Sequence, residues 1–149
     1  MVNDSKVKDA ILVVDDDLIF LKSVSKLLED EGYKVDTAES GKEALNKSRV
    51  ECYSLALIDI VLPDFDGIEL IEKMEETDPK MRKILITGYQ SPAYLKRALT
   101  LGINAYLVKP LKTDEILEVV RRQLMERNKE LEERYILLKD SADRSAAFS

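Results

Sequence analysis

The sequence contains no histidine and only one cysteine, Cys52. Without histidine the chain lacks the commonest general base and the commonest zinc ligand. It can neither use a Ser-His-Asp or Cys-His arrangement nor carry a phosphohistidine. A single cysteine excludes a disulfide bond within the chain. Any chemistry must therefore depend on carboxylates, lysine, hydroxyl groups or a bound ion.

Long apolar runs are also missing, and none approaches the ~20 residues that a membrane-spanning helix needs. The polar segment 1–9 lacks the apolar stretch of a signal peptide, and with the single thiol this predicts a cytoplasmic protein. Basic residues are outnumbered: 23 Lys and Arg against 29 Asp and Glu give a net charge of -6. This balance argues against direct contact with nucleic acid. The 149 residues, 45% of them apolar, suit one compact domain with a short appendage.

Five short runs rich in apolar and β-branched residues recur along the chain, and each predicts a strand. They are Ala10–Val14, Lys34–Ala38, Leu55–Ile58, Ile84–Thr87 and Ala105–Val108. The first, third and fourth are almost continuously apolar, as expected for central strands of a parallel sheet that is covered on both faces. Lys34–Ala38 alternates between polar and apolar residues, which favours a place nearer an edge.

Helical patterns fill the gaps between these runs. They predict helices over Leu18–Glu31, from a capping box at Ser40 to Glu43, over Ile68–Glu76, from Ser91-Pro92, and from Thr113 onward. Strand and helix thus alternate five times. The order predicts an α/β fold with a doubly wound, five-stranded parallel sheet of the flavodoxin-like (βα)5 type.

Polar residues follow four of the five predicted strands directly. In such a sheet, ligands bind outside the carboxyl ends of the strands. Each residue alone also fits a structural role, such as a helix cap, a turn former or a solvated loop side chain. Their convergence on one edge favours a functional site instead. The residues are Asp15, Asp16 and Asp17 after the first strand, Asp59 after the third, Thr87 at the end of the fourth, and Lys109 after the fifth.

Carboxylates crowded at one edge would repel one another unless a cation neutralised them. A small hard divalent cation, Mg²⁺ or Mn²⁺, suits oxygen ligands, whereas the lack of histidine argues against a softer metal. Beside such an ion, one carboxylate can act as a nucleophile toward a phosphoryl group, while lysine and a hydroxyl group stabilise the transferring oxygens.

The sequence resembles the receiver domains of two-component response regulators over about residues 8–127. The similarity lies in four segments that keep the order and strand context of that family: "ILVVDDD", "LALIDIVLPDFDG", "ILITG" and "AYLVKP". The resemblance implies a phosphorylation-activated signalling switch rather than a metabolic enzyme. It also implies that the phosphoryl group comes from a phosphohistidine of a sensor histidine kinase or histidine phosphotransfer protein, and that a downstream output domain or protein reads the change.

Carried over residue by residue, Asp59 resembles the phosphoacceptor. Asp15 and Asp16 resemble the metal-binding pair, of which Asp16 is the direct ligand, and Asp59 and the backbone carbonyl of Val61 complete the metal site. Asp17 lies outside the usual pair and is expected to cap the following helix.

Thr87 resembles the hydroxyl residue that turns toward the phosphoryl group, and Lys109 the lysine that pairs with it. Pro110 is expected to follow a cis peptide bond. Tyr106 resembles the aromatic switch that moves inward with Thr87, although a half-buried strand tyrosine is the plain alternative. Val61 and Tyr89, two residues beyond Asp59 and Thr87, are apolar and bulky and predict slow self-dephosphorylation.

The last helix is predicted to extend beyond the domain. Heptad spacing links Leu117, Leu124, Leu131 and Leu138, without Pro or Gly after Lys112. One interpretation is a parallel coiled coil that forms a homodimer; the other is a solvated helix with ion pairs along it. The resulting division is a receiver domain at 1–127, a helical extension and possible coiled-coil linker at 128–140, and a disordered tail at 141–149.

Two other functions fit parts of the pattern. A metal-dependent phosphohydrolase with an aspartyl nucleophile would use the same acidic site, but the second Asp of its DxD pattern is absent, since Ile60 and Val61 follow Asp59. A flavodoxin-like cofactor binder shares the order of elements. Its first turn should offer Gly, Ser and Thr amides to a phosphate, whereas this turn is acidic.

Overall fold

The computed structural model describes residues 9–88 and 92–147. Five parallel strands form one sheet in the order β2-β1-β3-β4-β5. The predicted fold class is therefore confirmed, and β2, the alternating strand, lies at an edge. β3 and β4 are longer than predicted, because β3 includes Asp59 and β4 begins at Arg82. The strands are β1 (Ala10–Val14), β2 (Lys34–Ala38), β3 (Leu55–Asp59), β4 (Arg82–Thr87) and β5 (Ala105–Val108).

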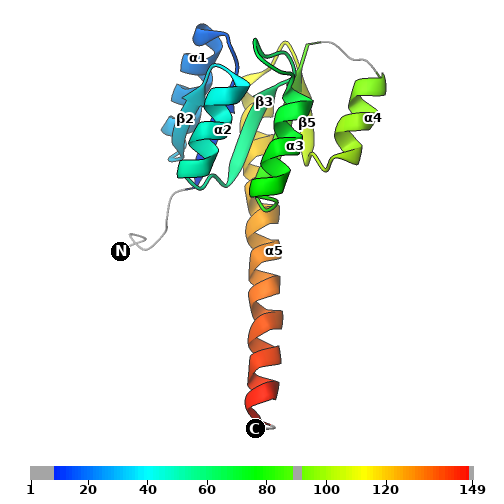
Figure 1. Cartoon of the computed structure of the whole chain (residues 1–149). Coiled ribbons are helices and arrows are strands. Elements are labelled where there is room, and N and C mark those ends of the chain that lie inside the picture. Colours follow the sequence, from blue (N-terminus) through cyan, green and yellow to red (C-terminus); the bar gives the residue numbers. More distant parts are fainter. Residues whose placement is uncertain (1–8, 89–91, 148–149) are drawn as a thin grey trace.

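Helices cover both faces of the sheet (Figure 1). One face carries α1 (Leu18–Asp30) and the long α5 (Thr113–Ala147), and the other carries α2 (Gly41–Val50), α3 (Gly67–Thr77) and α4 (Pro92–Thr100).

Alternate strand residues enter the two cores. In β1, Ile11 and Val13 pack with α1 and α5, whereas Leu12 and Val14 pack with α2 and α3. Because both faces are covered, a run with apolar residues at every position is stable only inside this sandwich.

Side-chain caps fix where three helices begin. Asp17 caps α1 by accepting the amides of Ile19 and Phe20, as predicted, and Asp66 caps α3. Ser40 accepts the Glu43 amide at 3.1 Å. The reciprocal bond of the predicted capping box differs, since the Glu43 carboxylate accepts the amide of Glu39 rather than that of Ser40. The predicted cap Ser91 lies outside the described residues.

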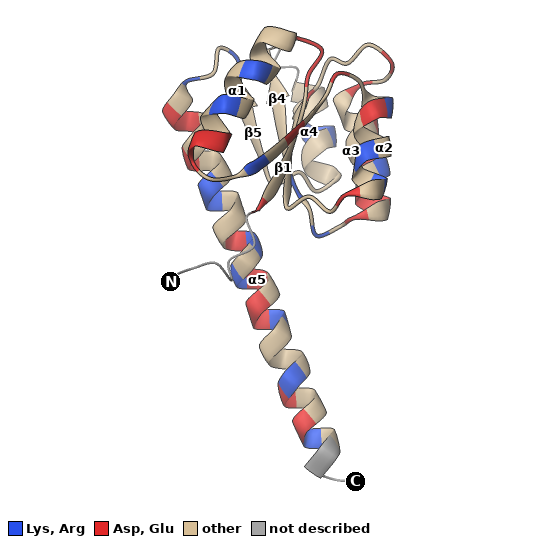
Figure 2. Ribbon diagram, turned by 90° about the vertical axis from the view of Figure 1, so that its left-hand side faces the viewer, with Lys and Arg blue, Asp and Glu red and all other residues tan. Residues whose placement is uncertain are grey.

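The helix α5 leaves the body of the domain and projects from it (Figures 1 and 2). Its first turns are anchored by Ile116, Val120 and Leu124 in the core shared with α1. Further along, charged residues of both signs alternate over the projecting part, and the large side chains of residues 135–138 are exposed. No helix in the described residues is long and apolar enough to cross a membrane.

The end of α5 corrects the predicted disordered tail at 141–149. The helix continues through Ala147, and only Phe148 and Ser149 lie outside the described residues. Segment 141–147 contains no Pro or Gly, so each added residue extends an existing helix at little cost in free energy.

Candidate functional site

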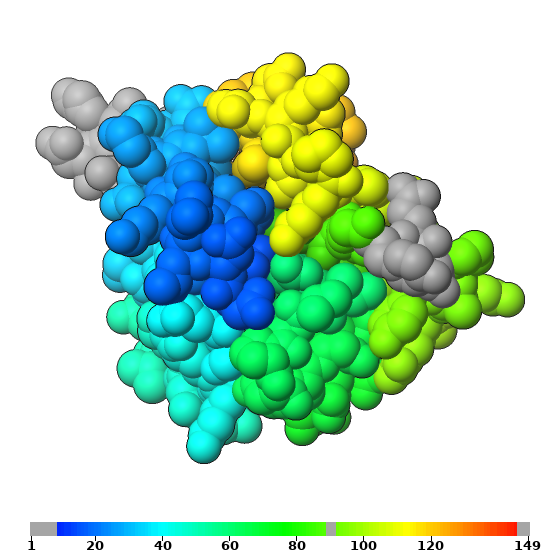
Figure 3. Space-filling view, turned by 90° about the horizontal axis from the view of Figure 1, so that it is seen from above, coloured from blue at the N-terminus to red at the C-terminus, as the bar shows by residue number. Residues whose placement is uncertain are grey.

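The predicted site residues meet at one edge of the sheet because all five strands run parallel and end there. Figure 3 views this edge from above. The first strand-helix turn, the β3–α3 loop and the loop after β5 come together at its centre, although they are far apart in sequence.

Asp15, Asp16 and Asp59 form a carboxylate cluster. One oxygen from each lies within 4.8 Å of the others. Asp15 and Asp59 are only 1% and 6% exposed, whereas Asp16 is exposed. Hence two buried acidic groups and one accessible group could share a cation.

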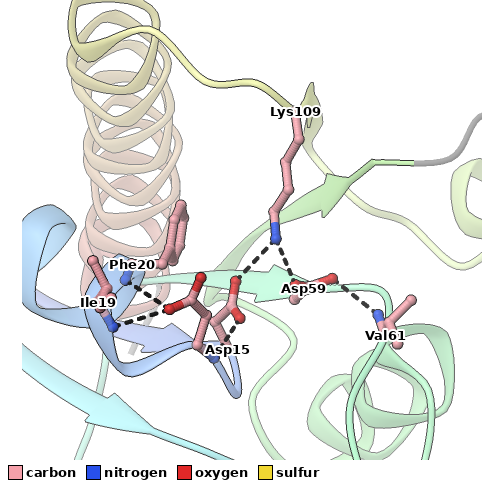
Figure 4. Close-up of polar contacts among 7 residues, drawn as sticks. Asp15, Ile19, Phe20, Asp59, Val61 and Lys109 are labelled. Carbon is pink, nitrogen blue, oxygen red and sulfur yellow. Dashed lines mark hydrogen bonds and ion pairs between the residues drawn. The ribbon is translucent and has the colours of Figure 1, made fainter.

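Lys109 reaches this cluster from the loop after β5 (Figure 4). Its Nζ lies 2.9 Å from Oδ2 of Asp59 and 3.3 Å from Oδ2 of Asp15. Burial acts to lower the pKa of Lys109, but the hydrogen bond to Asp59 and the charges of both carboxylates outweigh it, so the pKa is raised. The lysine is therefore held as a cation against the two buried carboxylates.

The pKa of Asp15 is raised by its burial and by its carboxylate neighbour. Burial raises its pKa from 3.8 to about 6, although the Asp17 amide, which donates to Asp15 Oδ1 at 2.9 Å, acts in the opposite direction. The neighbouring Asp59 raises the pKa further. A site that holds three carboxylates against one lysine, and whose donors are all oxygens, fits a small hard divalent cation.

The backbone around Asp59 is tightly constrained. The Val61 amide donates to Oδ1 of Asp59 at 2.9 Å, so both carboxylate oxygens are held in place. A Cβ atom at Gly67 would lie 2.5 Å from the Asp59 carbonyl oxygen and 2.9 Å from Cα of Ile60. Gly67 thus allows α3 to begin directly against the strand end that carries Asp59.

The remaining predicted residues occupy the neighbouring strands. Thr87 is fully buried at the end of β4, and Tyr106 on β5 is 45% exposed, so its ring is not packed inside the domain. The Lys109–Pro110 peptide bond is cis, the geometry that the resemblance implied. Val61 is 68% exposed, and its predicted companion Tyr89 lies outside the described residues.

Sequence reasoning missed two contributors to this edge. The Lys109 Nζ lies 5.2 Å from the centre of the Phe20 ring, a cation–π contact that helps to aim the lysine. Asp64 accepts the amides of Gly41 and Lys42 at 2.9 and 2.8 Å, so the loop after Asp59 also caps α2. Neither contact follows a local pattern, because each joins residues more than twenty positions apart.

Comparison with known proteins agrees with this geometry. The family model of the response regulator receiver domain matches residues 11–121. The chain belongs to this family, whose members act as switches in two-component signalling. Over 111 residues the chain is 36% identical to the chemotaxis protein CheY of Treponema pallidum, covering 72% of this chain and 77% of that protein.

Other relatives extend the comparison. The acid tolerance regulatory protein ActR of Rhizobium meliloti is 35% identical over 118 residues, which cover 79% of this chain and 61% of ActR. The crystal structure of a CheY-like receiver domain protein from Methanospirillum hungatei JF-1 superposes with a TM-score of 0.82 at 42% identity, covering 83% of this chain and 99% of that one. The chain thus spans less than two thirds of ActR, but nearly the whole of a solved receiver domain.

Proposed function

We propose that the chain is a phosphorylation-operated switch in which Asp59 accepts a phosphoryl group from a phosphohistidine of a sensor kinase or phosphotransfer protein. The observation that carries the proposal is the contact of Lys109 with both Asp59 and Asp15 inside a three-carboxylate cluster. Membership of the receiver family supports the same function.

In the proposed reaction, a carboxylate oxygen of Asp59 attacks the phosphorus atom of the phosphohistidine. The phosphorus–nitrogen bond breaks, its electron pair returns to the imidazole ring, and the phosphoryl group remains on Asp59 as an acyl phosphate. Lys109 stabilises the negative charge that develops on the transferring oxygens. The Val61 amide holds the second oxygen of Asp59 and so orients the carboxylate.

Asp15, Asp16, Asp59 and the backbone carbonyl of Val61 are the proposed ligands of Mg²⁺ or Mn²⁺. When bound, the ion would supply positive charge next to the phosphoryl oxygens. Support comes from the purely oxygen-based donors and from the three carboxylates that face one lysine.

The proposed conformational signal runs from Thr87 to Tyr106. Thr87 is buried at the end of β4, which pairs with β3. Tyr106 lies on β5, the other neighbour of β4, opposite Leu85. On phosphorylation, the Thr87 hydroxyl turns toward the phosphoryl group and Tyr106 moves inward. The surface formed by α4, β5 and α5 then changes its preference for partners.

We also propose that α5 transmits the signal to an output partner and holds two copies together. The apolar stripe that packs on the body continues past it, since Leu131 is half-buried and Tyr135 and Leu138 are exposed at 65% each. Light scattering over a range of concentrations tests this part. A mass that stays monomeric at high concentration contradicts it.

The experiment for the phosphoacceptor is intact mass spectrometry after incubation with acetyl phosphate, with Mg²⁺ or with EDTA. The wild type should gain one phosphate only with Mg²⁺, and Asp59→Asn should gain none. Asp143→Asn is the matched control, because it removes an exposed Asp on the projecting part of α5. A folded wild type that gains no phosphate, or an adduct that persists in Asp59→Asn, contradicts the assignment.

The lifetime of the adduct tests the proposed slow self-dephosphorylation. A half-life of seconds after removal of acetyl phosphate, with Mg²⁺ present, contradicts the shielding attributed to Val61 and Tyr89.

A further inference from the structure

A second pocket lies at the opposite edge of the sheet from Asp59. It has a volume of about 350 Å³ and is bounded by the start of β4, the turn before it and the part of α5 that leaves the body. The site edge and this edge are separated by the length of β4, six residues or roughly 20 Å. The pocket is therefore distinct from the carboxylate cluster.

Positive charge dominates this pocket although the whole chain carries a net charge of -6. Four cationic side chains line it against one carboxylate. The charged lining residues are Lys80, Arg82, Arg127, Glu130 and Arg134. In an acidic protein, such a local excess of positive charge raises the local concentration of anions.

Two guanidinium groups of the pocket each contain a buried nitrogen without a regular hydrogen bond. Arg82 is only 8% exposed, and its buried Nη2 forms an ion pair at 2.7 Å with Oε2 of Glu130 but no hydrogen bond of regular geometry. The Nε of Arg127, on α5, is buried and without an acceptor. Buried donors are nearly always satisfied in proteins, so the unpaired Nε of Arg127 points to an acceptor that would occupy the pocket.

The single carboxylate of the pocket does not meet this need. Oε2 of Glu130 pairs with Nη2 of Arg82 at 2.7 Å, whereas the Nε of Arg127 has no acceptor. The Glu130 side chain is 69% exposed and is free to move aside into solvent. The two oxygens of a carboxylate lie in one plane, whereas the oxygens of a tetrahedral phosphate point in several directions. A phosphate can therefore accept hydrogen bonds from guanidinium groups that come from different elements.

We infer that this pocket binds a small phosphate-bearing anion. Arg82 contributes from the sheet, and Arg127 and Arg134 contribute from α5. Arg82 belongs to the body of the domain, whereas Arg127 and Arg134 belong to α5. A bound anion would therefore link the two and hold the projecting helix in a fixed direction. The inference does not depend on phosphorylation of Asp59.

The test is calorimetric titration of the full chain with inorganic pyrophosphate, at constant ionic strength and in EDTA. The wild type should bind with a dissociation constant below 1 mM, a concentration range typical of weak small-molecule sites. The double variant Arg127→Gln/Arg134→Gln should bind at least about tenfold more weakly, because it loses charge-assisted hydrogen bonds.

Two controls separate this site from general electrostatics. The double variant Arg121→Gln/Arg122→Gln removes the same charge from exposed positions on α5 and should change the affinity less than about twofold. Lys109→Gln should leave the affinity unchanged, which excludes binding at the carboxylate cluster.

Glu130→Gln should bind pyrophosphate more tightly, because it removes the competing carboxylate.

Three results would overturn the inference. The first is no saturable binding of pyrophosphate, and the second is equal weakening in the two double variants. The third is binding of citrate or of a hexaglutamate peptide at least about tenfold more tightly than pyrophosphate. That result would assign the pocket to carboxylates or to an acidic protein segment. Circular dichroism of each variant confirms that it is folded.

Discussion

Replacing Asp15 with Asn should stabilise the metal-free protein, although it removes a residue of the proposed metal site. Asp15 is 1% exposed, and its pKa is raised from 3.8 to about 6, first by burial and then by Asp59 against the opposing amide of Asp17. At about 1.4 kcal/mol per pKa unit, this difference corresponds to roughly 3 kcal/mol of destabilisation above pH 6. An Asn can still accept the Asp17 amide but loses the contact with Lys109, so a net gain of about 1–2 kcal/mol is expected.

The assay is urea unfolding at pH 7.5 in EDTA, followed by far-ultraviolet circular dichroism. In thermal unfolding, the same gain in a chain of this size corresponds to a rise in Tm of about 3–6 °C. In Mg²⁺ at about one hundred times its dissociation constant, the wild type should gain about 2.7 kcal/mol and Asp15→Asn much less. The difference in free energy of unfolding between Asp15→Asn and the wild type should therefore shrink or change sign when Mg²⁺ is added.

The pH dependence has a definite sign. Because the folded-state pKa of Asp15 lies above the unfolded value, the folded protein takes up a proton first. The free energy of unfolding of the metal-free wild type should rise as the pH falls from 7.5 through about 6. The difference from Asp15→Asn should shrink over the same range.

Asp16→Asn is the matched control, since it removes an exposed carboxylate of the same cluster. It should leave the stability in EDTA nearly unchanged and abolish the gain in Mg²⁺. If Asp15→Asn is less stable than the wild type in EDTA at pH 7.5, the reasoning from crowded, buried carboxylates is wrong.

Asp64→Ala should lower the free energy of unfolding by about 1–2 kcal/mol in urea titrations, because the Gly41 and Lys42 amides lose their acceptor; an unchanged midpoint would refute the capping role. Gly67→Ala should destabilise by about 2 kcal/mol or more, since its Cβ would meet backbone atoms of Asp59 and Ile60. Gly41→Ala should cost less, because the atoms nearest to its Cβ belong to the Phe65 side chain, which can shift more easily than backbone; thermal unfolding of both variants decides this order. Lys109→Gln should slow phosphorylation by acetyl phosphate about 100-fold while the protein still binds Mg²⁺; a rate near that of the wild type, measured by intact mass, would remove Lys109 from the proposed chemistry.

Local patterns determined the elements of this fold. The three runs that are almost continuously apolar became the central strands, and Asp17 and Ser40 cap the helices that they were predicted to cap. These features depend on side chains a few residues apart, which the sequence displays directly. The same holds for the edge on which the acidic residues gather, because parallel strands bring their carboxyl ends together.

Only the tertiary structure decided which of these residues are buried and how they pair. That Asp15 is buried while Asp16 is exposed, and that Lys109 contacts Asp15 across 94 positions of sequence, depends on packing rather than on spacing. The length of α5 was underestimated because helix propagation needs only the absence of breakers, which a small polar tail does not signal. The pocket of Arg82 and Arg127 was invisible in the sequence, since its charges come from elements that meet only when α5 crosses the sheet.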